Sequence, residues 1–385
     1  MKIIKTLLPV LFTCLFLLNL SAQEIYFPEK GEWEEKEAST FNLDFSEVIE
    51  FAMENEYSES KDLRQAILKG FEHEPYHEIL GPTKRRGGPA GMILKDGYVV
   101  AQWGDTKRVD MTFSVTKSFL STTALIALDK NLINSVNQPV KEFVWDDTFE
   151  GEHNAKITWK HLFQQTSDWS GKLWETYDWA DRPPSEGSID DWKARKLNEP
   201  GSHYKYNDVR VNVLAYSLLQ VFREPLPKVL KEEIMDPINA SSSWRWYGYD
   251  NSWVAMDGLK MQSVSGGGHS GGGMFINTED MARFGLLFLN HGKWNGNQLI
   301  PSALIEEAMQ PSEANKNYGY MWWLNRAEEP QWEGIDRDIF YAAGFGGNYI
   351  IADKTNNMLI VTRWLEPSKL EEFMQLINKS LNDAK

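Results

Sequence analysis

Alternating apolar and polar segments predict two β-hairpins near opposite ends of the chain. Residues 92–101 hold two apolar runs around an Asp-Gly dipeptide, which favours the tight turn of an antiparallel hairpin. Residues 348–364 hold a second pair of apolar runs around a polar turn. Both pairs therefore predict antiparallel strands, one early and one late in the sequence.

Helical spacing of apolar residues appears on both sides of these hairpins and between them. It covers residues 45–52, where Asn42 or Asp44 is available as a cap, and residues 368–381 at the end of the chain. Residues 24–40 are polar and acidic, and we expect them to form a loosely held arm.

Early strands, a helical middle and late strands predict an α/β fold of the α+β type. One antiparallel sheet is built from both chain ends and flanked by helices, and a mostly helical lobe is inserted. We expect one domain over residues 24–385, with an α/β lobe of about 24–130 and 265–385 and a helical lobe of about 131–264.

The first residues have the layout of a secretory signal peptide. Lys2 and Lys5 precede an apolar run over 6–18, and the small residues Ser21 and Ala22 follow. Cleavage at the end of residues 1–23 predicts a periplasmic or secreted protein. A lipoprotein with lipid on Cys14 is the alternative, but the preceding Thr suits such a site poorly. No later segment has ~18 uninterrupted apolar residues, so no stable membrane insertion is expected.

Composition excludes several classes of protein. The chain of 385 residues has 55 acidic and 40 basic side chains and a net charge of −15, which disfavours nucleic acid as a partner. A single Cys excludes a disulfide framework and a Cys-based zinc site. The 16 Trp indicate an aromatic-lined cleft or a large aromatic core. Of Trp169, Trp174 and Trp179, we expect one or two to line a pocket and the others to pack.

Ser114 and Lys117 form a Ser-x-x-Lys pair at the start of an apolar helix that ends near Asp129. Residues three apart share a helix face, so a buried lysine lies beside the hydroxyl. Burial and the helix dipole lower the pKa of such a lysine, which then acts as the base that activates the serine. The N–H of Ser114 at the helix end faces a developing oxyanion.

Three further segments accompany this pair. A polar loop over 200–208 holds Tyr206, which can relay a proton between serine, lysine and leaving group. The segments 157–167 and 341–347 are two further recognisable stretches that accompany the Ser-x-x-Lys pair. The second lies directly before the late hairpin.

With these motifs the chain resembles the serine β-lactamase-like hydrolases, which include class C β-lactamases, D-alanyl-D-alanine carboxypeptidases, esterases and nylon-oligomer hydrolases. The resemblance covers residues 90–364 and implies that Ser114 is the nucleophile, Lys117 its base and Tyr206 the tyrosine of a Tyr-x-Asn motif. Asp208 stands where that motif has Asn, which leaves the hydrogen-bonding role of this position open.

The third family motif, Lys/His-Thr/Ser-Gly, is replaced by Ala342-Ala343-Gly344, so its cation is missing. The resemblance implies that this cation pairs with a substrate carboxylate, and its loss points to esters or neutral amides. Phe340, Tyr341 and Phe345 suggest an apolar wall instead. Gly344 and Phe345 are expected at the oxyanion site, with the Phe345 N–H as the second donor.

The Gly-rich segment 266–273 resembles the esterase and nylon-oligomer branch, with His269 in the site wall. Its Gly-x-Ser-x-Gly around Ser270 also matches the α/β-hydrolase nucleophile elbow, but that motif needs a helix directly afterwards. The Gly-rich segment also lacks the Gly-Lys-Ser/Thr of a phosphate loop, so it does not predict nucleotide binding. His73 and His77 are four apart, yet Pro75 lies between them and no third ligand is evident, so no metal is expected.

The resemblance therefore implies a serine hydrolase of a small ester or amide that needs no cofactor. A β-lactamase or a D-alanyl-D-alanine carboxypeptidase is one alternative. A non-catalytic penicillin-binding sensor domain, favoured by Asp208 and the missing cation, is another. The sequence leaves the physiological substrate and the oligomeric state open.

Overall fold

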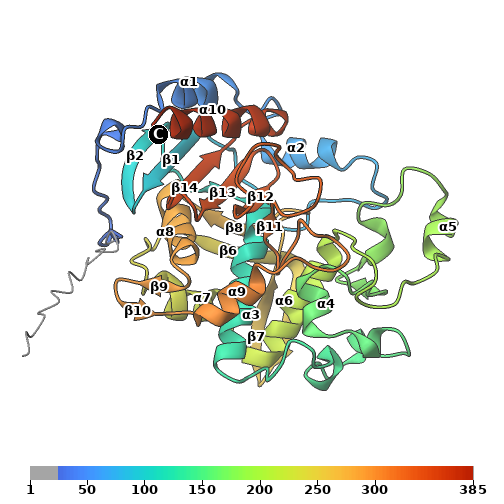
Figure 1. The fold of residues 1–385 in the computed structure, drawn as a ribbon. Helices are drawn as coiled ribbons and strands as arrows, with labels where there is room; N and C mark the ends of the chain where they lie inside the picture. Colours follow the sequence, from blue (N-terminus) through green and yellow to red (C-terminus); the bar gives the residue numbers. More distant parts are fainter. Residues whose placement is uncertain (1–24, 385) are drawn as a thin grey trace, which may run out of the picture.

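The computed structural model describes residues 25–384 and contains a six-stranded sheet that both chain ends build (Figure 1). All its neighbouring strands are antiparallel, in the order β11-β12-β13-β14-β1-β2. This confirms the fold predicted from the pattern of apolar segments. The strands are β1 (Ala90–Lys95), β2 (Tyr98–Trp103), β11 (Trp323–Leu324), β12 (Phe340–Gly344), β13 (Asn348–Asp353) and β14 (Met358–Arg363).

Both predicted hairpins are present. Asp96 (φ 54°) and Gly97 (φ 87°) form the turn between β1 and β2 in the left-handed conformation that such tight turns require. β13 and β14 pair from Tyr349 opposite Thr362 to Asp353 opposite Met358. The pairing of β14 with β1 then joins the late hairpin to the early one.

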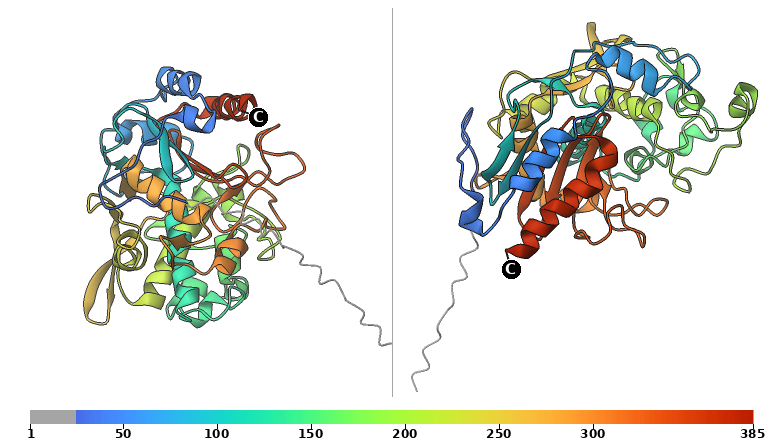
Figure 2. Two further views of the ribbon diagram at one scale, coloured as in Figure 1. Left: turned by 60° about the vertical axis from the view of Figure 1, so that its left-hand side comes forward. Right: turned by 90° about the horizontal axis from the view of Figure 1, so that it is seen from above.

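Helices cover both faces of this sheet (Figure 2). α1 (Ser46–Glu54) and α10 (Leu370–Asp383) pack together on one face, and α8 (Thr278–Leu289) lies on the other, against β13 and β14. A Cβ at Gly285 of α8 would meet Ile350 and Leu359, so the glycine allows the helix to approach the sheet closely.

The second lobe holds a helical layer around α3 (Thr116–Asp129) and α6 (Asp208–Phe222), and a four-stranded sheet in the order β3-β8-β6-β7. The long β6–β7 hairpin lies within the segment expected to be mostly helical. The remaining helices are α2 (Leu63–Gly70), α4 (Trp159–Phe163), α5 (Ile189–Lys193), α7 (Leu226–Leu230) and α9 (Ser302–Ala308). The remaining strands are β3 (Asp110–Met111), β4 (Lys172–Leu173), β5 (Thr176–Tyr177), β6 (Arg245–Met256), β7 (Leu259–Val264), β8 (Gly273–Ile276), β9 (Lys293–Trp294) and β10 (Asn297–Gln298). Single helical turns lie at Ala38–Phe41, Phe113–Val115, Val140–Glu142, Asp147–Phe149, Asn154–Lys156, Asp178–Ala180, Lys231–Met235 and Pro367–Lys369.

The expectation of a loosely held arm before residue 40 is wrong for the described part of that segment. The Tyr26 N–H donates to the Asp96 carbonyl (3.0 Å), and the Tyr26 ring stacks on Tyr98 at 4.8 Å between centroids. Lys36 N–H donates to the Val99 carbonyl (2.9 Å), so the arm follows β2. Its few aromatic residues anchor a chain whose composition is otherwise polar.

Within residues 25–384 no helix has both the length and the apolar character needed to span a bilayer. The expected signal peptide and Cys14 lie outside the described residues.

Candidate active site

Ser114 lies on the helical turn η2 (Phe113–Val115), which runs directly into the buried helix α3. Phe113 has φ 48°, a left-handed conformation that is strained for a bulky residue and typical of functional turns. A Cβ at Gly344 would overlap the Thr112 carbonyl and lie 3.3 Å from Ser114 N. Glycine at the end of β12 therefore allows this strand to pack against the serine turn.

Lys117 lies one turn along α3, as its spacing from Ser114 predicts. Its Nζ is 2.9 Å from Ser114 Oγ, and the whole residue is 1% exposed. Burial lowers the pKa of Lys117, but the neighbouring Asp208 carboxylate and Tyr206 raise it by more, so the net shift is upward. The expectation of a lowered lysine pKa is therefore wrong, because it considered the helix and not the carboxylate that packs against it.

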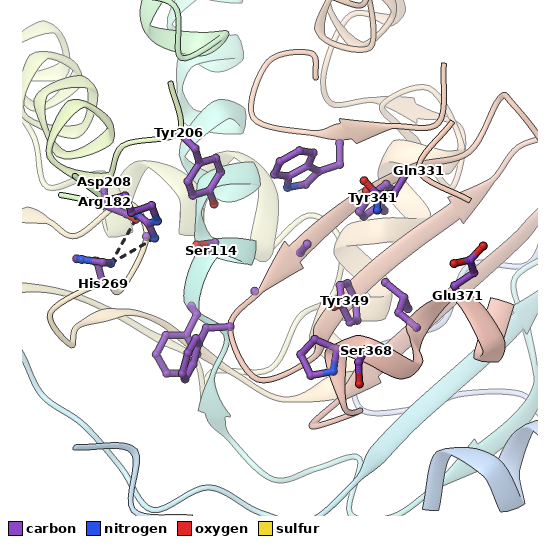
Figure 3. Close-up of a pocket in the computed structure, with 18 of the residues that line it drawn as sticks. Ser114, Arg182, Tyr206, Asp208, His269, Gln331, Tyr341, Tyr349, Ser368 and Glu371 are labelled. Carbon is purple, nitrogen blue, oxygen red and sulfur yellow. Dashed lines mark hydrogen bonds and ion pairs between the residues drawn. The ribbon is translucent and has the colours of Figure 1, made fainter. Parts of the chain in front are cut away.

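Tyr206 lies over the serine from the loop before α6, and its hydroxyl points toward Ser114 in Figure 3. Its ring stacks on Trp323 (5.8 Å between centroids), and Lys117 Nζ lies 4.6 Å from the ring centre. The motif at 157–167 holds this loop: Gln165 Oε1 accepts from the Asn207 N–H (2.7 Å), and the Gln165 carbonyl accepts from the Lys205 N–H.

Asp208 is the first residue of α6 and is an ionic partner rather than a neutral amide. Its Oδ1 is 2.5 Å from Lys117 Nζ, and its Oδ2 accepts from Arg182 Nη1 at 2.7 Å. Burial raises the pKa of Asp208, but Lys117 and Arg182 outweigh it and hold that pKa well below its usual range. The carboxylate is therefore ionised and paired with two cations.

Arg182 is a charged residue of the pocket that the sequence did not indicate. It lines the pocket beside Ser114 and Tyr206, and it pairs with Asp181 (2.5 Å) as well as with Asp208. The cation missing from β12 is thus partly replaced from another loop. No local pattern around Arg182 signals this position, because Asp208 and His269, its partners in the pocket, are 26 and 87 residues away in the sequence.

His269 and Glu74 extend this charged cluster. His269 Nδ1 is 3.3 Å from Arg182 Nη2, and its Nε2 is 2.6 Å from Glu74 Oε2. His269 lines the same pocket as Ser114, where we expected it, whereas nothing in the sequence pointed to Glu74.

Gly267 explains part of the Gly-rich segment. A Cβ at this position would overlap both Asp208 Oδ1 and Lys117 Nζ, so glycine makes room for the ion pair. Ser270 does not form a nucleophile elbow, because the strand β8 follows it instead of a helix.

The pocket has a volume of about 500 Å³ and reaches from Ser114 past β12 to the start of α10 (Figure 3). Tyr341 and Phe345 line it as expected, but Phe340 packs on Trp322 in the core. Its tryptophans are Trp323 and Trp332, and not the three that we singled out. Trp169 is buried, and Trp174 and Trp179 line other cavities.

Ser114 and Phe345 are placed where two backbone N–H groups can face one oxyanion. Ser114 belongs to the first turn of the helix, where N–H groups have no partner within the helix. Phe345 directly follows Gly344, which contacts the Ser114 turn. The arrangement combines a hydroxyl, a lysine, a tyrosine and two N–H groups at one end of the pocket.

The two-lobed fold and the Ser-Lys-Tyr site define a β-lactamase-like protein. A sequence profile of the Beta-lactamase family matches residues 81–363, and the chain belongs to this family. No curated protein matches the chain significantly by sequence.

Solved structures with related folds carry several activities in their titles. A β-lactamase from Mycobacterium bovis is 17% identical with a TM-score of 0.55, over 83% of this chain and 99% of that one. A Bacillus anthracis protein named as a 6-aminohexanoate-dimer hydrolase is 15% identical with a TM-score of 0.57, over 94% of this chain and 89% of that one. A family VIII carboxylesterase is 15% identical with a TM-score of 0.55, over 83% and 96%. At these identities the likeness establishes the fold.

Proposed function

We propose that the protein is a secreted serine hydrolase that cleaves small esters or amides through an acyl-enzyme on Ser114. The observation that carries the proposal is the 2.9 Å contact between Lys117 Nζ and Ser114 Oγ at the end of the pocket. The carboxylesterase and the 6-aminohexanoate-dimer hydrolase among its structural neighbours support the ester or amide class. The apolar run before Ser21 supports secretion.

In the resting state Lys117 is an ammonium ion that donates to Ser114 Oγ and to Asp208 Oδ1, because its pKa is raised. The reactive form is the minor one in which Lys117 has released a proton. Its neutral amine then takes the Ser114 proton as Oγ attacks the carbonyl carbon. The population of this form rises with pH.

The tetrahedral intermediate is stabilised by the N–H groups of Ser114 and Phe345. Tyr206 passes the proton from Lys117 to the leaving alcohol or amine as its bond to the carbonyl carbon breaks. Water then attacks the acyl-enzyme and gives one proton to the neutral Lys117 amine, which returns it to Ser114 Oγ as the ester bond breaks and the free acid leaves.

A second candidate, hydrolysis of carboxylate-bearing β-lactams or peptides, is favoured by Arg182 in the pocket. A guanidinium can bind a carboxylate with two parallel hydrogen bonds. However, Asp181 and Asp208 already pair with Arg182, which compensates its charge. The ester or neutral amide therefore fits this pocket better.

The test is to label the purified protein with a fluorophosphonate probe and to map the adduct, together with kcat/KM for p-nitrophenyl acetate and for a cephalosporin. We expect one adduct on Ser114 and a higher kcat/KM for the ester. An equal or higher value for the cephalosporin would restore the β-lactamase alternative. Labelling of Ser114 without turnover of either substrate would instead support a sensor domain.

A further inference from the structure

A second cavity, of about 240 Å³, lies beside the catalytic pocket, and His269 lines both. Glu74, His77 and Asp181 also line this second cavity. The proposed hydrolase mechanism does not use Glu74 or His77, and nothing in the catalytic geometry requires two imidazoles at this place.

The donor atoms of these side chains converge. Glu74 Oε2 is 2.6 Å from His269 Nε2 and 3.7 Å from His77 Nδ1. One donor atom from each of the three residues lies within 4.8 Å of the other two. Asp181 Oδ1 is 3.8 Å from His269 Nε2. In a tetrahedral site with bonds of roughly 2.0–2.1 Å, donors lie roughly 3.3 Å apart, so small side-chain movements would enclose a metal ion.

His77 supplies an independent observation. Its side chain is 5% exposed, yet its Nε2 has no hydrogen-bond partner among the described residues, and its Nδ1 is 3.7 Å from the nearest carboxylate. A buried imidazole normally has a partner for at least one ring nitrogen. The nitrogen that faces Glu74 is Nδ1, so a metal ion bound there would give the ring one partner and would leave Nε2 as it is.

We propose that Glu74, His77 and His269 form a binding site for a divalent transition metal such as Zn²⁺, with Asp181 or water as a fourth ligand. Two imidazoles and one carboxylate are a ligand set that zinc uses in proteins. The three carboxylates Glu74, Asp181 and Asp208 around His269 outnumber the cations Arg182 and Lys117, so the local charge favours a bound cation.

Metal binding also has a defined consequence for His269. Coordination through Nε2 places its proton on Nδ1, where Arg182 now donates. Asp208 Oδ2 is 3.6 Å from this nitrogen and would become its acceptor, as the outer carboxylate that commonly orients a metal-bound histidine. A protonated Nδ1 cannot accept from Arg182, so the guanidinium would lose this contact and keep its pairs with Asp181 and Asp208. The site thus reaches Asp208, the partner of Lys117.

His73 and His77 looked unsuitable as a metal pair because no third ligand was evident in the sequence. In the structure His77 lies instead beside Glu74 and His269. Folding brings Glu74 and His269, which are 195 residues apart, to His77.

The experiment is calorimetric titration of the chelator-treated protein with ZnCl₂, with MgCl₂ as a parallel titrant. We expect one equivalent of Zn²⁺ and no Mg²⁺ to bind. His77→Ala and Glu74→Gln should each weaken Zn²⁺ binding by at least about tenfold, a loss that even outer partners of metal ligands cause. His73→Ala is the matched control and should bind Zn²⁺ as the wild type does.

Circular dichroism and Tm show whether each variant is folded. If His77→Ala does not fold, Glu74→Gln still tests the site. Absence of Zn²⁺ binding to the wild type would overturn the proposal. So would unchanged binding in the folded variants, or loss of binding in His73→Ala alone.

Discussion

The two walls of the catalytic pocket are assembled in different ways. The aromatic wall comes mostly from β12 and its neighbour β11, which carry Tyr341 and Trp323, and from Phe345, which directly follows β12. The charged wall gathers Arg182, Asp208 and other ionic side chains from segments that are far apart in the sequence. One wall is thus set by periodicity along a strand, and the other by the way in which separate loops close.

This difference explains what each wall contributes to the chemistry. In the proposed reaction the aromatic wall offers apolar surface to the acyl group, and such contacts change little between bound substrate and transition state. The charged wall sets the protonation state of Lys117 through Asp208, so it acts on the reacting groups themselves. Substitutions of residues between the two walls should therefore reduce turnover most. Substitutions in the charged wall should have a smaller effect on turnover, and substitutions in the aromatic wall the smallest.

The largest effect is expected at Ser114, where both walls meet. Ser114→Ala should reduce kcat for p-nitrophenyl acetate by on the order of 10³ or more, because the nucleophile is lost. Ser270→Ala, in the competing Gly-x-Ser-x-Gly motif, is the control and should retain most activity. If the two effects were reversed, the assignment of the nucleophile would be wrong.

Tyr206→Phe should have the next largest effect on turnover. The variant keeps the ring that stacks on Trp323 and loses the hydroxyl, so kcat should fall by on the order of 10² with an unchanged Tm. Tyr204→Phe is the matched control. Tyr204 lies two residues before Tyr206, and its ring packs on Tyr318. Unchanged turnover in Tyr206→Phe would remove this tyrosine from the proton relay.

Gly267→Ala tests the charged wall without changing a charge. The added Cβ would displace Asp208 Oδ1 and Lys117 Nζ, and a displacement of about 1 Å can cost up to about 10²-fold in turnover. Gly88→Ala is the control, since a Cβ there meets nothing within 4 Å. Equal kcat in the two variants would show that the tight fit around the ion pair is not needed.

The same division sets how far the sequence predicted the site. Ser114, Lys117, Tyr206 and Phe345 lie in short motifs with local spacing, and the structure brings them to one pocket. Arg182 and Glu74 carry no local signal, because an ion pair across 26 or 195 residues depends on tertiary closure. The upward pKa shift of Lys117 was missed for the same reason.

Most of the fold was accessible from periodicity. The two hairpins and the helices at 116–129, 208–222 and 370–383 follow apolar patterns, and the predicted sheet is present. The β6–β7 hairpin was not predicted, since its exposed face and its bulged register do not alternate regularly. The ordered arm along β2 depends on isolated aromatic anchors that a polar composition hides.

Asp208→Asn tests whether the charged wall controls Lys117. A neutral amide removes the anion that raises the lysine pKa and leaves burial, which lowers it. Since the neutral amine is the base, kcat/KM should rise with pH, and in the variant this rise should occur at lower pH. Activity at pH 7 should increase severalfold relative to the wild type.

The measurement for Asp208→Asn is kcat/KM of a p-nitrophenyl ester from pH 6 to 10. Because the Lys117 pKa is raised in the wild type, its kcat/KM should still be rising at pH 10, whereas that of the variant should level off earlier. Asp257→Asn removes a carboxylate from an exposed ion pair with Arg223 and is the control for a general change in charge. If the rise with pH stayed at the wild-type position, Asp208 would not set the protonation state of Lys117.

The smallest effect is expected on the aromatic wall, at Phe345. Its ring contacts Phe71 and Phe113 and lines the pocket, whereas its proposed catalytic group is the backbone N–H, which Phe345→Ala retains. Loss of part of this apolar surface costs about 1 kcal/mol of binding, so KM should rise about fivefold while kcat changes little. Phe143→Ala, in a half-buried ring that lines another cavity, is the control. A large fall in kcat with unchanged KM would mean that the ring positions the oxyanion donor, and the aromatic wall would then act on the reacting atoms as the charged wall does.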